Sequence, residues 1–313
     1  MEPLVSIVSL TYNHEPFIRK ALDGFIMQKT DFPFEVVIHD DASTDRTQEI
    51  IKEYEKEYPD IIKPIYQSVN QKSIGDGIVT RTAFAAAHGK YIALCEGDDF
   101  WTYERKLQEQ IDFLEANPEY VMSFHDALVI HQNKEDKTET FRERFEQLQQ
   151  RTTFNHKDVV NGWFMPTASM VYRNDLFDKW PDWFYKVYSG DYTLQLMISQ
   201  HGLIKFHDNI WCTHLKHEGG VSQRTDLDSY RLNKRIYQLR KYIKHFDKEH
   251  RYGFSLTLLH LYRIKLKSKT NFYESINTRT HIVLLRIAIQ PFYYCQQFSV
   301  SELKARILNN FQK

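Results

Sequence analysis

The sequence is poor in cysteine. Its 313 residues include three cysteines, Cys95, Cys212 and Cys295, and no two of them are spaced as a CxxC pair. A sparse, odd set of this kind argues against a disulfide framework and against a thiolate zinc site. We therefore expect the chain to fold in a reducing compartment without covalent cross-links.

Long hydrophobic runs are also missing. The nearest candidate, residues 282–294, is short and is interrupted by Arg286, Gln290 and Pro291, whereas a helix needs about 20 apolar residues to cross a bilayer. The first residues, MEPL, lack the basic and apolar regions of a secretory signal. These observations predict a cytoplasmic protein, with at most a peripheral contact at the inner face of the membrane.

Neither sign of charge is in excess. Lysine and arginine together number 41, as do aspartate and glutamate, so the formal net charge is zero. General nucleic-acid binders carry a basic excess that neutralises phosphates, so no nucleic-acid partner is expected. The proportions of hydrophobic residues (42%) and charged residues (26%) are typical of a folded globular protein.

The first third of the chain alternates between strand and helix patterns. Strands are predicted at residues 5–10, 35–38, 61–66 and 91–95, and helices at residues 17–27, from 44 onward and at 82–88. Gly89 is predicted to be the C-cap of the last of these helices. This alternation indicates an α/β fold with a mostly parallel central sheet flanked by helices.

The rest of the chain is less regular. Residues 132–150, rich in charged and amide side chains, are expected to form an exposed connection or helix. Tyr, Lys, Arg and Leu recur through residues 231–267 and predict helices. We therefore expect one domain over residues 1–225 and a helical extension over residues 226–313, which would be a helical cap, a homodimer contact or a contact with an anionic membrane.

Polar clusters follow three of the predicted strands. Tyr12 follows the first strand, Asp40 and Asp41 follow the second, and residues 96–101 (EGDDFW) follow the strand that ends at Cys95. In such sheets ligands bind outside the carboxyl ends of the strands. The three clusters therefore predict a single site at one edge of the sheet.

The acidic run at residues 96–99 points to a metal ion. Neighbouring carboxylates repel one another, and burial makes it harder to ionise both Asp98 and Asp99. Mg²⁺ or Mn²⁺ removes this conflict, because these ions prefer oxygen ligands and often take substrate phosphates as further ligands. The alternative is a helix N-cap whose acids lie near the positive end of the helix dipole.

Four more side chains are candidates for the same site. Asp41 offers hydrogen-bond acceptors to a base or ribose, and Tyr12 offers an aromatic face to a base. Considered alone, Asp41 would be a turn residue and Tyr12 a residue of the core or its rim. Asp191 is an N-terminal helix cap unless the fold brings it to the sheet edge, where it would accept a proton. His217, in a polar, glycine-rich loop, either faces solvent or is a further metal ligand.

Together these motifs resemble those of the family 2 glycosyltransferases, which have the GT-A fold. Residues 5–13 (VSIVSLTYN) are similar to the family's opening strand, residues 39–47 (HDDASTDRT) to its second signature, and residues 89–99 (GKYIALCEGDD) to the strand before its DXD-type metal motif. The three motifs occur in family order. The resemblance implies a GT-A (Rossmann-like) fold and a transfer of sugar from a nucleotide-sugar, most often a UDP-sugar.

The resemblance also implies how the donor would be bound. Tyr12 and Asp41 would contact the nucleotide base, and Arg81 falls in a region that often contacts the nucleotide. Asp98 would bind the ribose or diphosphate. The metal ion, Mn²⁺ or Mg²⁺, would be held by Asp99, with His217 completing the metal or diphosphate site.

Asp191 matches the acid of a later "ED" signature in the family. It would be the general base of an inverting displacement, although Gly190 stands where the signature has glutamate. Because many bacterial relatives build cell-surface polysaccharides, the acceptor implied is a saccharide or a lipid-linked saccharide. Two other functions stay open, a metal-dependent hydrolase and a non-catalytic module that binds a nucleotide or sugar.

Overall fold

The computed structural model describes residues 2–74, 77–132, 138–220, 229–267 and 277–285. The chain divides into two compact units. The first comprises residues 1–185 and 191–225 and contains the sheet. The second comprises residues 186–190 and 226–313 and is mainly helical where it is described.

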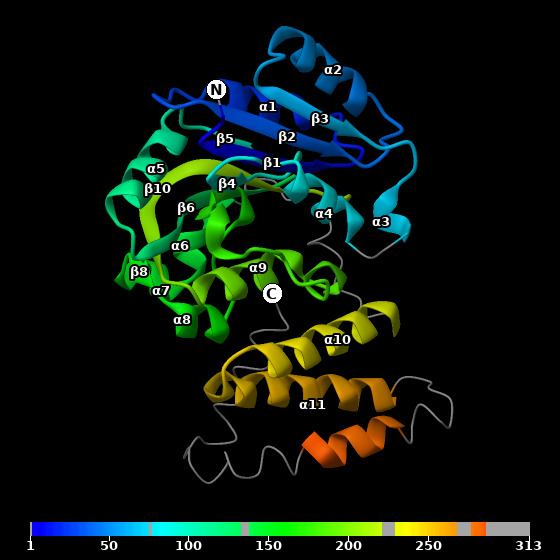
Figure 1. The fold of residues 1–313 in the computed structure, drawn as a ribbon. Helices are drawn as coiled ribbons and strands as arrows, with labels where there is room; N and C mark the ends of the chain where they lie inside the picture. Colours follow the sequence, from blue (N-terminus) through cyan, green and yellow to red (C-terminus); the bar gives the residue numbers. More distant parts are fainter. Residues whose placement is uncertain (1, 75–76, 133–137, 221–228, 268–276, 286–313) are drawn as a thin grey trace. The chain divides into compact units, whose positions relative to one another are not determined.

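The first unit is built on a curled sheet with the strand order β3-β2-β1-β4-β9-β6-β10-β5 (Figure 1). In addition, β7 pairs with β6 and β8 with β10. The strands are β1 Val5–Thr11, β2 Phe34–Asp40, β3 Ile62–Tyr66, β4 Tyr91–Leu94, β5 Phe100–Trp101, β6 Tyr120–His131, β7 Thr138–Thr140, β8 Thr153–Phe154, β9 Val171–Arg173 and β10 Leu203–Lys216.

Two parallel groups make up most of this sheet. In one, β1 pairs in parallel with β2 and β4, and β2 pairs with β3; in the other, β6 pairs in parallel with β10. The short strand β9 joins the groups by pairing antiparallel with both β4 and β6. The α/β class and the flanked central sheet predicted from the sequence are confirmed.

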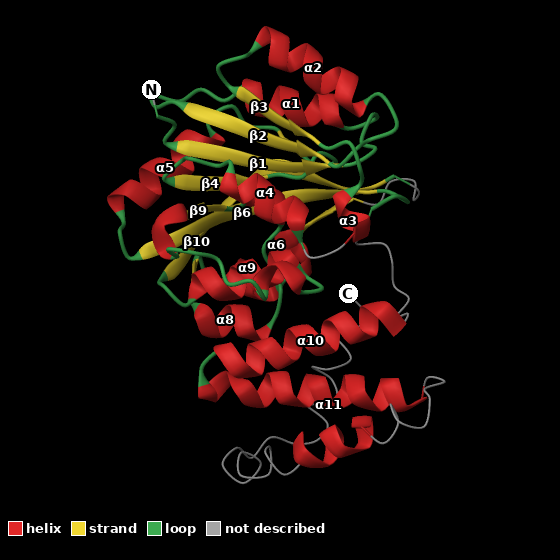
Figure 2. Cartoon of the chain, turned by 45° about the vertical axis from the view of Figure 1, so that its right-hand side comes forward, coloured by secondary structure: helices red, strands yellow, loops and turns green. Residues whose placement is uncertain are grey.

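Helices lie on both faces of the sheet, with α1, α2 and α5 on one side and α4 on the other (Figure 2). Their spacing explains the packing, since Ile18, Ala21, Leu22 and Phe25 form one buried stripe on α1. The helices of this unit are α1 Ile18–Ile26, α2 Thr47–Glu57, α3 Gln71–Ile74, α4 Ile78–Ala85, α5 Lys106–Ala116, α6 Phe141–Arg144, α7 Glu146–Gln150, α8 His156–Asn161 and α9 Gly190–Ser199.

The C-cap predicted at Gly89 is wrong, and the helix before it is present with different bounds. The helix expected at residues 82–88 is α4, which starts earlier and ends at Ala85 with Ala86 as its C-cap. Gly89 instead lies against β1, where a Cβ atom would be 2.4 Å from the backbone nitrogen of Ser6. Its own N–H donates to Ser6 Oγ at 2.8 Å. Glycine is therefore present because two backbones approach closely.

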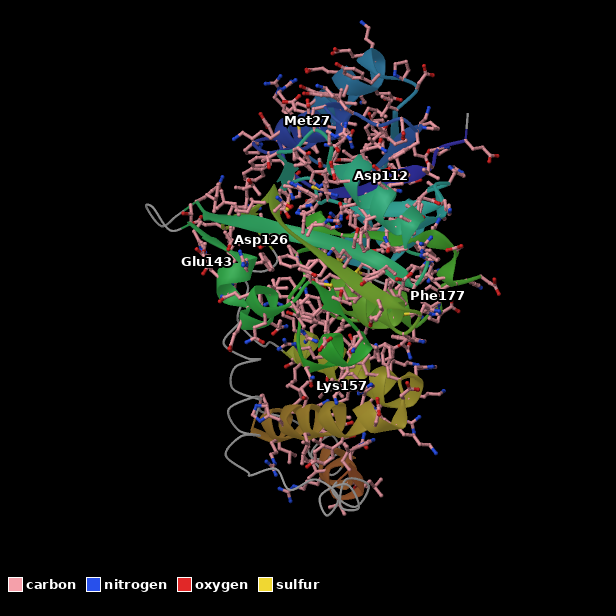
Figure 3. The ribbon with its side chains drawn as sticks, turned by 90° about the vertical axis from the view of Figure 1, so that its left-hand side faces the viewer. Met27, Asp112, Asp126, Glu143, Lys157 and Phe177 are labelled. Atoms are coloured by element: carbon pink, nitrogen blue, oxygen red, sulfur yellow. The ribbon has the colours of Figure 1, made fainter. Side chains whose placement is uncertain are left out.

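The expectation of an exposed segment at residues 132–150 is also wrong in part. Residues 133–137 lie outside the described residues, but Phe141, Phe145 and Leu148 of the two short helices α6 and α7 are buried. Asp126 of β6 fixes this segment, because its Oδ1 accepts from the backbone nitrogen of Arg142 at 3.1 Å (Figure 3). The charged residues between the aromatic ones concealed this apolar face.

A buried lysine lies beneath the strand that follows the acidic run. Lys106 of α5 is fully buried; its Nζ lies 3.9 Å from the ring centroid of Trp101 and donates to Gln110 Oε1 at 2.8 Å. Trp101 is held in turn by a 2.7 Å hydrogen bond from its Nε1 to the carbonyl of Ala168. Burial lowers the pKa of Lys106 to about 7.

The second unit contains the helices predicted through residues 231–267. They are α10 Ser229–His245 and α11 Arg251–Lys267, and residues 277–285 form another helix. α10 and α11 pack through an apolar core that includes Ile236 and Tyr242 from α10 and Phe254 and Leu258 from α11. No helix within the described ranges has the length and apolar character needed to cross a membrane.

We expect Gly89→Ala to destabilise the first unit by about 1–3 kcal/mol, because the added methyl forces β4 away from β1. Chemical denaturation would measure the loss. Gly162→Ala is the matched control, since a Cβ there meets nothing within 4 Å and its effect should stay within about 0.5 kcal/mol. Equal stability of the two variants would contradict the close approach described for Gly89.

The buried lysine should make stability depend on pH. Its folded pKa of about 7 lies below its ordinary value of 10.5, so between these values the unfolded chain binds the extra proton and the wild type gains stability as pH rises. Lys106→Met lacks this dependence. Its free energy of unfolding relative to wild type should therefore fall by about 2 kcal/mol from pH 6 to pH 9.

Urea denaturation at the two pH values measures this difference. Lys56→Met removes an exposed lysine from α2 and should show the same difference from wild type at both pH values. If Lys106→Met behaved in the same way as Lys56→Met, the burial of a titrating lysine would be refuted.

Candidate functional site

The acidic run forms a tight turn between β4 and β5. Gly97 N–H donates to the carbonyl of Leu10 at 3.0 Å, which ties the turn to β1. A Cβ on Gly97 would lie 2.8 Å from Thr11 Oγ1 and 3.0 Å from His14 Nδ1. A larger residue would push the turn off the end of β1, so glycine sets the position of the flanking carboxylates.

Asp99 points inward and ties the turn to β10. Its carboxylate oxygens both lie 3.0 Å from Nδ1 of His214, and Oδ1 also accepts from the backbone nitrogen of Leu215 at 2.9 Å. Burial raises the pKa of Asp99, with His214 opposing the rise. Burial would lower the pKa of His214, but the nearby Asp99 carboxylate holds it above its ordinary value. The two side chains therefore form a partly buried, charge-assisted pair.

Asp98 points toward the open edge of the sheet and meets two other histidines. Its side chain is 21% exposed, and Oδ2 lies 3.0 Å from Nε2 of His217 and 3.9 Å from Nε2 of His14. Burial would raise the pKa of Asp98, but the hydrogen bond with His217 and the charge of His14 hold it below its ordinary value. His217 follows directly after β10, whereas His214 belongs to the strand.

Glu96 was not among the predicted site residues. Burial, together with the negative charges of Asp98, Asp99 and Asp191, raises its pKa to about 8, with Lys72 acting in the opposite direction. The influence of Asp191 places the start of α9 close enough to the acidic turn to act on Glu96. The signal in the sequence was the acidic run itself, in which Glu96 is the first carboxylate.

The loop after β2 adds Asp41 to this edge in a structural role. Asp41 is buried, and its two carboxylate oxygens accept from the backbone nitrogens of Gln71 at 2.7 Å and Lys72 at 3.0 Å. It therefore holds the start of α3 and brings Lys72 toward the acidic turn. These hydrogen bonds leave lone pairs on both oxygens, so Asp41 retains acceptor capacity for a ligand.

The loop after β1 is fastened to the loop after β2. Asn13 and Ala42 both have positive φ values, 54° and 61°, which are uncommon for residues other than glycine. Asn13 Oδ1 accepts from the backbone nitrogen of Thr44 at 2.8 Å, and Asn13 N–H donates to Ser43 Oγ at 2.9 Å. Strained backbone of this kind gathers at ligand-binding loops.

Tyr12 and Arg81 are the remaining predicted residues. Tyr12 is 40% exposed at the end of β1, as an aromatic face that receives a base would be. Arg81 of α4 lies with its guanidinium carbon 4.7 Å from the ring centroid of Tyr185. Arg81 and Tyr185 both belong to the first unit, so this contact lies within that unit.

The donor set fits a divalent cation that takes further ligands from a substrate. In the described part of the chain no three or more His, Cys, Asp or Glu side chains are arranged to hold a metal ion by themselves. Asp98 nevertheless offers an ionised carboxylate, and Glu96 lies where negative charge is in excess. Mg²⁺ and Mn²⁺ are commonly held by one or two carboxylates together with substrate phosphates.

Comparison with known proteins matches this chain to one family. The family model described as glycosyl transferase family 2 matches residues 6–180. Among curated relatives, an uncharacterised protein of Mycobacterium bovis is 43% identical over 169 residues, which are 54% of this chain and 46% of that protein. The chain spans about half the length of the curated relatives it matches.

Solved structures share the fold. Staphylococcus aureus TarS 1–349, in complex with UDP-GlcNAc, matches with a TM-score of 0.65 and 18% identity, over 100% of this chain and 90% of that chain. The mannosyltransferase PcManGT from Pyrobaculum calidifontis, in complex with GDP-Man and Mn²⁺, matches with a TM-score of 0.57 and 16% identity, over 99% and 87%. The predicted GT-A fold is thus confirmed.

The family match covers more than half of the chain and includes the strands that carry Tyr12, Asp41 and the acidic turn. The fold and the family predicted from the sequence motifs agree with this match. The chain belongs to glycosyl transferase family 2.

Proposed function

We propose that this chain is an inverting glycosyltransferase that moves a sugar from a nucleotide-sugar, with UDP as the nucleotide, to an acceptor hydroxyl. The observation that carries the proposal is the contact between Asp98 and His217 at the acidic turn, where Asp191 acts electrostatically on Glu96. The two acids of the turn follow β4, His217 follows β10 and Asp191 belongs to α9, so the fold itself collects them. Family membership supports the same reaction.

The chain's own residues have separate tasks in this reaction. Tyr12 and Asp41 receive the nucleotide base, and Arg81 contacts the nucleotide, the role that the family resemblance implies. Asp98 and His217 bind the diphosphate end of the donor, with Lys72 nearby as a positive charge. A divalent cation bound there neutralises charge on the departing diphosphate.

Asp191 is the proposed general base. The acceptor oxygen attacks the anomeric carbon opposite the diphosphate, the carbon–oxygen bond to the diphosphate breaks, and Asp191 takes the acceptor's proton. A carboxylate suits this task because the hydroxyl becomes acidic only as the new bond forms. Gly190, where the family signature has glutamate, leaves room beside it, since a Cβ there meets nothing within 4 Å.

We propose a different task for Asp99 from the metal contact predicted from the sequence. Its contacts with His214 and Leu215 occupy it inside the protein, so we assign it to positioning the turn and assign metal contact to Asp98 with His217. The resemblance implied that Asp98 binds the ribose or diphosphate of the donor. In this proposal Asp98 makes that contact together with the cation. We exchange the two roles because Asp99 points inward, whereas Asp98 points toward the open edge of the sheet.

Two neighbours support the choice of donor and cofactor. One was solved with UDP-GlcNAc and another with GDP-Man and Mn²⁺, so a nucleotide-sugar with Mn²⁺ or Mg²⁺ is the proposed ligand pair. We further propose a hexosyl or N-acetylhexosaminyl group as the sugar. The acceptor would be a saccharide or lipid-linked saccharide in the synthesis of cell-surface polysaccharide or glycolipid.

We also propose a division of labour between the two parts of the chain. Residues 1–225 would be the catalytic domain and residues 226–313 an extension that adds a homodimer or peripheral membrane contact. Synthesis would then occur on the cytoplasmic side, at the inner face of the membrane. The basic character of the extension supports the membrane contact.

We expect Asp98→Asn to weaken binding of UDP in the presence of Mn²⁺ by at least about tenfold, because the amide cannot supply the charge that holds the cation. Isothermal titration calorimetry with and without Mn²⁺ measures this. Asp60→Asn, at an exposed position, is the matched control and should bind as the wild type does. Binding that does not depend on Mn²⁺ in the wild type would contradict the assignment of Asp98.

We expect Asp191→Asn to lower kcat by about 10²–10⁴-fold, the usual contribution of a general base. Its Kd for UDP with Mn²⁺ should stay within about twofold of wild type, because Asp191 acts on the acceptor. The assay follows UDP release from a panel of UDP-sugars with and without saccharide acceptors. Asp182→Asn, also exposed, should keep the wild-type kcat.

The same assay separates the alternatives. UDP release at full rate without any acceptor would indicate a hydrolase. UDP binding without turnover on any donor and acceptor pair would indicate a binding module. A variant Asp191→Asn with unchanged kcat would remove Asp191 from the mechanism.

A further inference from the structure

A phenylalanine packs against the two histidines at the acidic turn. The ring centroids of Phe17 and His217 are 4.5 Å apart, with the ring planes at 44°. The same phenylalanine meets the ring of His14 edge-on, with centroids 6.2 Å apart and planes at 73°. Nε2 of each histidine faces the carboxylate of Asp98. Phe17 therefore contacts both of the histidines that stabilise Asp98.

The turn before α1 holds this phenylalanine in place. The backbone nitrogens of Phe17 and Ile18 both donate to the carbonyl of His14, at 2.9 and 2.8 Å. The backbone nitrogen of His14 in turn donates to Oγ1 of Thr47 at 2.9 Å, which fastens the turn to α2. The position of Phe17 is thus set by the packing of β1, α1 and α2, whereas His217 comes to it from the end of β10.

Phe17 has little reason to be present on local grounds. It is the N-cap residue of α1 and makes no side-chain cap hydrogen bond, whereas Ser, Thr, Asp and Asn are preferred at that position because they cap the first N–H groups. It is also only partly buried, so it lies outside the fully buried stripe of α1. A residue that neither caps its helix nor fills the core indicates a task in its remaining contact, the one with the histidines.

The hydrogen bond made by His217 requires one orientation of its ring. Nε2 lies 3.0 Å from Oδ2 of Asp98, and an ionised carboxylate only accepts, so Nε2 carries a proton and donates it. Rotation about χ2 of a histidine is broad and roughly two-fold, and a half turn would put a carbon where Nε2 stands. On another side of the ring, a Cβ at Gly219 would lie 3.3 Å from Nδ1, and glycine has no side chain that could hold the ring. Phe17 supplies the packing that the glycine does not.

We propose that Phe17 is a positioning residue, whose ring holds the imidazole of His217 in the orientation that donates from Nε2 to Asp98. A group that is already ordered loses less freedom when a ligand binds, so Phe17 prepares Asp98 and His217 for the diphosphate of the donor and its cation. This last step rests on the proposed function. The orientation of His217 does not, because it is a property of the chain without ligands.

The orientation can be measured without any ligand. In the full chain, labelled with ¹⁵N-histidine and free of metal, two-bond ¹H–¹⁵N spectra report which ring nitrogen carries the proton. The spectra are recorded at about pH 8.5, above the ordinary imidazole pKa of about 6.5, and the signals of His217 are those missing from His217→Gln. We expect Nε2–H alone in the wild type and a mixture of both tautomers in Phe17→Leu. The same tautomer pattern in the two proteins would overturn the proposal.

Binding of the donor nucleotide measures the consequence. We expect Phe17→Leu to weaken binding of UDP in the presence of Mn²⁺ by about three- to tenfold, because the released ring has to be ordered on binding. Phe17→Tyr keeps the aromatic ring and should bind within about twofold of wild type. Phe113→Leu is the matched control, since Phe113 is also partly buried and packs against a histidine, with its ring centroid 5.6 Å from that of His207. Equal losses in Phe17→Leu and Phe113→Leu would contradict a specific task for Phe17.

A double variant tests whether Phe17 acts through His217. In the His217→Gln background, Phe17→Leu should change the Kd for UDP with Mn²⁺ by less than about twofold, because the ring that Phe17 positions is absent. Losses that simply add would show a different route and refute the assignment. A wild type that binds no UDP with Mn²⁺ would instead contradict the proposed function, and the histidine spectra would still decide whether Phe17 positions His217.

Discussion

Electrostatic repulsion among three carboxylates in one turn is the constraint on which the first unit depends. Glu96, Asp98 and Asp99 lie within four residues at the end of a buried strand, where ionising all three is unfavourable. The structure reduces the repulsion in a different way for each of the three carboxylates. Asp99 is paired with the partly buried His214, Asp98 is stabilised by two histidines near the edge, and Glu96 is left with a raised pKa. The negative charge that remains is what makes the turn suitable for a cation.

This solution requires partners from distant parts of the chain. His214 and His217 belong to β10 and its end, and β10 reaches the turn because β9 joins the two parallel groups of strands. His14 comes from the loop after β1, which is itself fastened to the loop after β2. The sheet order is therefore what turns an unfavourable acidic run into an ordered site.

Much of this arrangement could be predicted from the sequence because it is local. The apolar runs of β1, β2 and β4 gave the strands, and the polar residues after them marked the edge at which they meet. The direction of neighbouring side chains could not be predicted, and this direction is the reason why we propose the metal contact for Asp98 and a positioning task for Asp99. Gly89 and residues 132–150 were misassigned because a close backbone approach and a buried aromatic face depend on tertiary packing, which no short pattern records.

The contact between Asp98 and His217 joins residues 119 positions apart, and this separation has a consequence for biosynthesis. A ribosome adds roughly 5–20 residues per second, so on the order of ten seconds pass between the emergence of the acidic turn and that of its histidine. During that interval β1, β2 and β3 have emerged together with their pairing partners, and Asp98 has His14 as a neighbour, but His214 and His217 have not yet emerged. The nascent chain thus acquires the half that carries Tyr12 and Asp41 first and its charge-balanced turn last.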